Sequence, residues 1–69
     1  MKDERLVNFG RSVRNVRKLK GLSQEALANL ANIDRSYMGH IERGEKNVTL
    51  TKIYQIADAL DISVSKLLS

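Results

Sequence analysis

Two residues able to act together chemically, Ser36 and His40, stand four positions apart in a stretch that also carries Arg35 and Arg43. If this stretch is a helix, the hydroxyl and the imidazole share one face, as a nucleophile and its base would. Catalysis would also require a pocket, an oxyanion hole and an acid that orients His40, and the sequence indicates none of them. We therefore expect no catalytic residue and no enzyme.

The composition also argues against several other kinds of site. His40 is the only histidine and there is no cysteine, so we expect neither a metal site nor a disulfide. Nothing indicates a cofactor or a small-molecule substrate. No apolar run approaches the roughly 18 residues that a bilayer requires, and the first ten residues lack the apolar centre of a signal peptide. We expect a cytoplasmic protein that makes no membrane contact.

Positive charge is concentrated in the middle of the chain. The net charge is +4, but residues 10–52 hold nine lysines and arginines against four acidic residues. Residues 1–9 are balanced, and residues 53–69 carry a net charge of −1. This placement favours a polyanion bound at one surface, although a basic face that only meets solvent is the alternative.

A repeated pattern predicts where four helices begin. In each case an apolar residue precedes a capping Ser, Thr or Asp, and a second apolar residue follows five positions after the first, as in a hydrophobic staple. The four are Leu22-Ser23-Leu27, Ile33-Asp34-Met38, Val48-Thr49-Ile53 and Ile62-Ser63-Leu67. A further helix precedes them and ends at Gly21. We expect one all-α domain over residues 1–69, with helices at about 3–20, 24–31, 35–43, 50–60 and 64–68.

The second and third helices have the features of a helix-turn-helix over about residues 24–43. Their connection is so short that one residue must accept a positive φ, and Asn32 is the best non-glycine choice there. Ala28, one turn earlier, is small enough to let the two helices approach. This combination indicates a helix-turn-helix, although an ordinary helical hairpin would share parts of it.

The third predicted helix has two different sides. At 100° per residue, Met38 and Ile41 face the core, while the opposite side is polar, basic or small. A helix fits the major groove of DNA, so we expect base contacts from that side: Arg35, Ser36, Gly39 and His40. A glycine at position 39 costs about 1 kcal/mol of helix propensity relative to alanine. That cost is explained if the helix must approach a groove floor closely; the alternative is that Gly39 is the result of neutral drift on a solvated face. For His40 two expectations stay open: its side chain contacts a base or a phosphate, or it only meets solvent.

Phosphate contacts are expected around that helix. The candidates are Ser23, Gln24, Tyr37, Arg43, Lys46, Asn47 and Lys52. The first turn of the second helix attracts anions through its free N–H groups. Tyr37 alternatively is a partly buried ring against the second helix. Arg17 and Glu42 are expected to form an ion pair between the first and third helices, which is a structural role.

Two long segments, LSQEALANLANIDRSYMGHIERGEKN and TLTKIYQIADALDISVSKLL, resemble the Cro/phage-repressor (Xre-type) helix-turn-helix family. Within it, DRSYMGHIERGEKNVTL is most similar to restriction–modification controller proteins. The resemblance implies a compact five-helix, lambda-repressor-like fold. It also implies a homodimer that binds a palindromic double-stranded DNA operator and regulates its own gene and the endonuclease gene. It further implies the base contacts and the ion pair given above, and, among the phosphate contacts, those of Gln24, Tyr37, Arg43, Lys46 and Asn47. Asn32 stands where the family often has glycine, and His40 is unusual there.

The dimer surface is expected near the C-terminus. Its apolar residues exceed what one short helix needs, namely Ile62, Val64, Leu67 and Leu68. Two copies would then read half-sites about 34 Å apart. The alternatives are a phage-type or other Xre-family repressor, and an antitoxin or adaptor in which the helix-turn-helix is only a scaffold for protein contacts.

Overall fold

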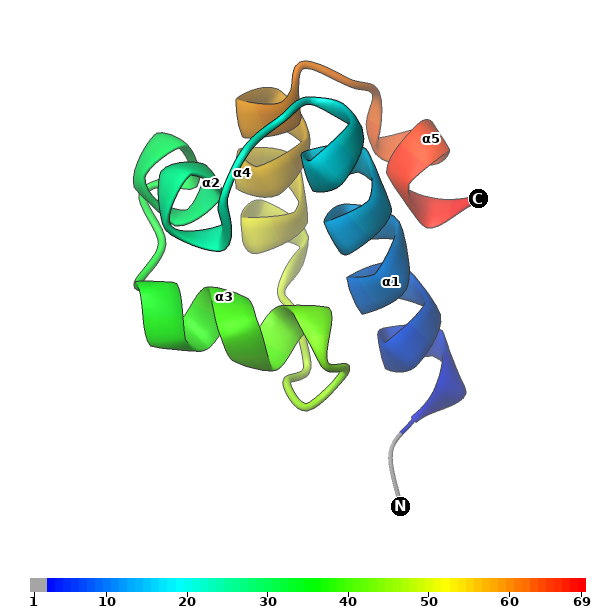
Figure 1. The fold of residues 1–69 in the computed structure, drawn as a ribbon. Coiled ribbons are helices and arrows are strands. Elements are labelled where there is room, and N and C mark those ends of the chain that lie inside the picture. The colour runs from blue at the N-terminus through cyan, green and yellow to red at the C-terminus, as the bar shows by residue number, and fades with distance from the viewer. Residues whose placement is uncertain (1–2) are drawn as a thin grey trace.

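The computed structural model describes residues 3–69, which form five helices and no strand (Figure 1). The helices are α1 (Glu4–Leu19), α2 (Gln24–Ala31), α3 (Arg35–Glu42), α4 (Leu50–Leu60) and α5 (Val64–Leu68). The predicted all-α class is confirmed, with bounds within one residue of those expected. Across the described chain, no helix is both long and apolar enough to cross a membrane. Residues 1 and 2 of the predicted domain lie outside the described residues.

Each helix begins at a side chain that caps its first turn. Ser23, Asp34, Thr49 and Ser63 each accept a hydrogen bond from the N–H three residues later, at 3.0–3.3 Å. Such a cap satisfies a donor that has no partner inside the helix. The four predicted helix starts are therefore confirmed. Asp3 caps α1, and its side-chain hydrogen bond from Arg5 lowers the pKa of the Asp3 carboxyl to about 2.

The core lies between the buried faces of all five helices. Its fully buried large side chains are Val13, Leu27, Met38, Ile41, Ile56, Leu60 and Leu67. α1 packs against α3 and α5, and α2 packs against α3 and α4. Every helix thus buries one face, which is how so short a chain assembles a core without disulfides.

The turn between α2 and α3 has the expected geometry. Asn32 adopts φ 57° and ψ 45°, and the N–H of Ile33 donates to the carbonyl of Ala28 at 2.8 Å. Ala28 is almost completely buried. Asp61 ends α4 with nearly the same φ and ψ, which we did not predict. The helix-turn-helix prediction for this segment is therefore supported by its backbone.

Gly10 permits a close approach between α1 and α3 that we did not predict. A Cβ at Gly10 would overlap the carbonyl oxygen of Ile41 and lie 2.6 Å from that of Glu42. Gly44 is constrained in the same way, since its Cβ would lie 2.7 Å from the Cα of Val7. These two contacts hold the C-terminal end of α3 against α1.

α3 lies at one edge of the molecule, whereas the connection from α4 to α5 lies at the opposite end (Figure 1). One side of α3 packs on the core through Met38 and Ile41. The rest of the described chain leaves the other side of α3 uncovered at Arg35 and Ser36, which are both exposed. This side of α3 is therefore open to solvent at its N-terminal end.

Candidate nucleic-acid interface

A shallow polar hollow of about 260 Å³ lies on the outward side of α3. It is lined by Gln24, Arg35, Ser36, Gly39, His40 and Arg43. All four residues that we expected to face bases border this hollow, together with two from the expected phosphate set. None of the six has an apolar side chain, so the hollow suits a polar or anionic partner better than an apolar one.

Gly39 is not exposed on this surface, although we expected it to be. It is buried, because two long side chains cover it: Arg43 Nη1 and Gln24 Oε1 lie 3.2 and 3.4 Å from where a Cβ would stand. The expectation that the Gly39 backbone is open to a groove floor is wrong in this structure. The missing side chain instead makes room for Gln24 and Arg43, since a Cβ at position 39 would crowd the end of the Arg43 side chain.

Arg17 and Glu42 form the expected pair between α1 and α3. Arg17 Nε donates to Glu42 Oε2 at 2.7 Å and Nη2 to Oε1 at 2.9 Å, while Nη1 donates to the carbonyl of Leu22 at 3.0 Å. Their side chains are only 11% and 4% exposed. The hydrogen bonds that Arg17 donates to the Glu42 carboxylate raise the pKa of the Arg17 guanidinium, so Arg17 stays charged. The pair fixes the inward side of α3.

Gln24 is oriented by the same carboxylate. Its Nε2 donates to Glu42 Oε1 at 3.2 Å, which leaves the carbonyl oxygen of Gln24 near Gly39. A carbonyl oxygen accepts and cannot donate to a phosphate. The bond to Glu42 uses one hydrogen of the Gln24 amide, so the second hydrogen on Nε2 remains able to donate to a phosphate. The backbone N–H of Gln24, in the first turn of α2, belongs to the group that has no partner inside a helix.

An acid lies beside His40, contrary to our expectation. His40 Nδ1 is 2.7 Å from Glu45 Oε1, and Arg43 Nε donates to the same oxygen at 3.1 Å. Glu45 follows α3 in the loop, where Gly44 has φ 75° and the N–H of Glu45 donates to the carbonyl of His40 at 2.9 Å. The loop therefore turns back and places this carboxylate next to the imidazole.

The other expected phosphate contacts do not line the hollow. Ser23 is exposed, and its Oγ caps α2 while its own O–H can still donate. Lys46 and Asn47 are exposed in the loop after α3. Tyr37 is half-buried against the core, which matches the alternative we gave for it. Lys52 Nζ lies 5.8 Å from the centre of the Tyr37 ring, so these two residues form a separate part of the surface.

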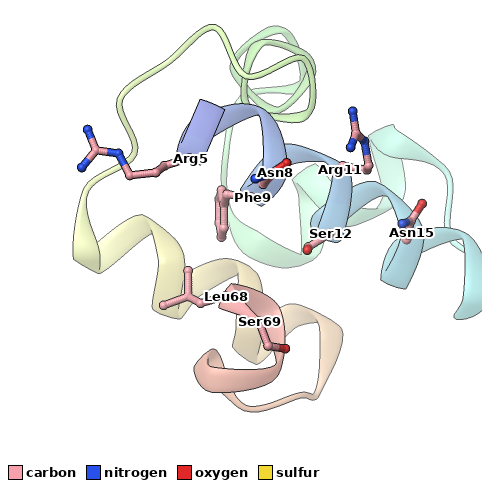
Figure 2. A pocket seen from close by; sticks show the side chains of 8 residues that line it. All are labelled: Arg5, Asn8, Phe9, Arg11, Ser12, Asn15, Leu68 and Ser69. Atoms are coloured by element: carbon pink, nitrogen blue, oxygen red, sulfur yellow. The ribbon is translucent and has the colours of Figure 1, made fainter. Parts of the chain in front are cut away.

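The C-terminal residues expected at a dimer surface differ in exposure. Leu67 is fully buried in the core of its own chain. It has no exposed surface for a second copy, so the expectation that it lies at a dimer surface is wrong. Ile62 and Val64 are half-buried, also against the core. Leu68 is 56% exposed and borders a hollow of about 450 Å³ between α1 and α5 (Figure 2). In Figure 2, Phe9 points from α1 towards Leu68.

Two exposed apolar residues of α4 were not among our candidates. Leu50 and Tyr54 are 66% and 53% exposed. They stand one turn apart on the same side of α4, away from the buried Ile56 and Leu60. Helical spacing from the core residues of α4 would have identified both.

Comparison with known proteins places these features in a family. A family model described as helix-turn-helix matches residues 13–67. Control protein C.SmaI of Serratia marcescens is 47% identical over 58 residues, covering 84% of this chain and 69% of that protein. Control protein C.BamHI of Bacillus amyloliquefaciens is 43% identical over 61 residues, covering 87% of this chain and 75% of that protein.

A solved structure agrees in fold and in sequence. The crystal structure of the restriction-modification controller protein C.AhdI from Aeromonas hydrophila superposes with a TM-score of 0.88 at 53% identity. The match covers 90% of this chain and 94% of that one. Family, relatives and fold agree with the Xre-type resemblance and with the absence of an enzymatic role. The chain therefore belongs to the helix-turn-helix family of DNA-binding transcriptional regulators.

Proposed function

We propose that this protein is a restriction–modification controller protein that binds a palindromic operator as a homodimer and regulates transcription from it. In this proposal α3 of each copy lies in the major groove of one half-site. The observation that carries it is the hollow on the outward side of α3, where Arg35, Ser36 and His40 stand together. The proteins named as control proteins among the relatives support the controller assignment.

Three side chains are proposed to contact base edges. Arg35, in the first turn of α3, donates two hydrogen bonds to O6 and N7 of a guanine, a contact worth about 1–3 kcal/mol of discrimination. Ser36 donates or accepts beside it, and His40 reads a base one turn further on. Gly39 contributes indirectly, because it leaves the space in which Arg43 and Gln24 lie over the hollow.

Phosphate contacts are proposed to position α3 in the groove. The charged ones come from Arg43, Lys46 and Lys52, supported by polar groups of Ser23, Tyr37 and Asn47 and by the backbone N–H of Gln24. Three cations per copy give six in a dimer, so the logarithm of the binding constant should fall with the logarithm of salt concentration with a slope of roughly −5.

The proposed dimer fits the size of the domain. The chain extends 30 Å along its longest axis. Two copies side by side can therefore present their α3 helices to half-sites about 34 Å apart, one helical turn of DNA. We propose that Leu68, with Ile62 and Val64 beside it, contributes to the contact, and that Leu50 and Tyr54 are further candidates because they are exposed and apolar. The bacterial relatives support a cytoplasmic location, where bacterial DNA lies.

Selection of binding sites from random double-stranded DNA tests this proposal. The expected product is a palindrome with two half-sites about one helical turn apart, bound with affinity that falls steeply with salt. Binding that stays flat with salt, or that does not separate the selected duplex from random DNA, would contradict it. Restriction and modification genes next to the coding sequence would support the controller branch, and phage genes there would contradict it.

A further inference from the structure

His40, Arg43 and Glu45 form a bonded cluster at the rim of the polar hollow. Glu45 Oε1 lies 2.7 Å from His40 Nδ1 and accepts from Arg43 Nε at 3.1 Å. Arg43 Nη2 is 3.2 Å from the same His40 Nδ1. One imidazole nitrogen therefore faces both an acceptor and a donor, and only one of these contacts is a hydrogen bond.

The distances identify which contact is the hydrogen bond. A carboxylate accepts only, so an Nδ1 without hydrogen would set two lone pairs against each other at 2.7 Å. The short contact to Glu45 therefore requires a hydrogen on Nδ1 of His40, and it has the length of a charge-assisted bond. Arg43 also donates only, so its longer contact to Nδ1 is not a hydrogen bond. Arg43 is instead tied to Glu45 through Nε.

Fixing the hydrogen on Nδ1 determines what the other nitrogen of His40 can do. A neutral imidazole has one donor and one acceptor nitrogen, so Nε2 is the acceptor. Nε2 has no hydrogen-bond partner within residues 3–69. The side chain is 42% exposed and borders the hollow beside Arg35 and Ser36. When the imidazole is neutral, the surface offered to a ligand at this point is therefore a hydrogen-bond acceptor.

We propose that Glu45 is a specificity-determining residue that acts through His40. By holding the Nδ1 hydrogen, Glu45 makes Nε2 an acceptor, and His40 then selects a base edge that carries an amino group, N6 of adenine or N4 of cytosine. Without Glu45 the hydrogen is no longer held on Nδ1, so Nε2 can also donate to guanine or thymine. This inference rests on the proposed function, because it assumes that α3 lies in the major groove.

The role of Glu45 is separable from folding and from overall charge. Its side chain is one-third exposed, and exposed ion pairs contribute little to stability, so removing the carboxylate leaves the fold intact. Losing one negative charge near DNA also raises affinity for every sequence alike. Glu25, exposed in the first turn of α2, supplies the matched control, since Glu25→Ala removes the same charge without touching His40.

The experiment compares binding-site selections for the natural chain, His40→Ala, Glu45→Ala and Glu25→Ala at about pH 8, above the ordinary titration range of imidazole. His40→Ala identifies the base pair that His40 reads. There the natural chain should prefer adenine or cytosine, and Glu45→Ala should reduce that preference at least about fivefold while other positions keep theirs. Glu25→Ala should leave every preference unchanged.

Four results would each overturn the inference while leaving the proposed function in place. Two concern the carboxylates: Glu45→Ala keeps the same base preference as the natural chain, or Glu25→Ala loses that preference equally. Two concern His40: the natural chain prefers guanine or thymine at the His40 position, or His40→Ala changes the preference at no position. If the natural chain selects no sequence at all, the proposed function fails and the inference fails with it.

Discussion

The two sides of α3 differ in what their polar groups bind within the chain. On the inward side, Glu42 accepts from both Arg17 and Gln24, and the neighbouring apolar side chains are buried. On the outward side, Arg35 and Ser36 are exposed, and no side-chain hydrogen bond ties either of them to the rest of residues 3–69. One eight-residue helix thus holds the fold together with one side and leaves donors for a partner on the other. Substitutions on the two sides should have separable effects.

The largest effect is expected on the inward side, from Glu42→Gln. This change leaves the buried Arg17 guanidinium without its anion, which costs about 3–5 kcal/mol. In a domain of this size that lowers Tm by at least about 12 °C in thermal unfolding followed by circular dichroism. The fraction that stays folded should keep its base preferences. If Glu42→Gln kept the natural Tm and altered the base preferences, the two sides of α3 would not have separate roles.

Two adjacent leucines of α5, one buried and one exposed, should also have separable effects on stability and on assembly. Leu67→Ala empties a fully buried site and should cost about 2–5 kcal/mol of unfolding free energy. Leu68→Ala removes a largely exposed side chain and should change it by less than about 0.5 kcal/mol. If Leu68 lies at the dimer contact, Leu68→Ala should weaken dimerisation in analytical ultracentrifugation. Equal losses of stability from the two changes would contradict the burial of Leu67.

On the outward side, Arg35→Ala should remove about 1–3 kcal/mol of discrimination at one base pair of each half-site. Stability should stay within about 0.5 kcal/mol, because no hydrogen bond of Arg35 holds the fold. Competition binding with the selected duplex and its single-base variants measures the loss. The prediction fails if discrimination at every position survives the change.

The smallest effect is expected from Lys46→Ala, in the loop after α3. A lysine on a phosphate carries no sequence information, so affinity for selected and random duplexes should fall by similar factors. The salt slope should become shallower by about 1 per copy, measured by titration at several salt concentrations. A change confined to one base pair would instead make Lys46 a base contact.

Local patterns predicted the parts of the fold that depend on local chemistry. The helix starts followed from caps such as Ser23 and Thr49, because capping involves residues three positions apart. The αL turn at Asn32 followed from the short connection. The two sides of α3 followed from helical spacing, which placed Met38 inward and Arg35 outward.

The features that were missed depend on how distant segments approach. Gly39 is covered because side chains from α2 and from the end of α3 fold over it, which spacing within one helix cannot reveal. Glu45 reaches His40 only through the path of the loop after Gly44. Gly10 matters only because the backbone of α3 lies against it. Leu67 and Leu68 are adjacent in sequence, and only the packing of α5 separates them.

The most direct measurement is a crystal structure of the chain bound to the duplex that selection from random DNA enriches. In that complex, α3 of each copy should lie in the major groove, with Arg35 bonded to a guanine and the Arg17–Glu42 pair unchanged on the inward side. A complex in which another element occupies the groove, or in which Arg35 and Ser36 touch no base, would contradict this prediction.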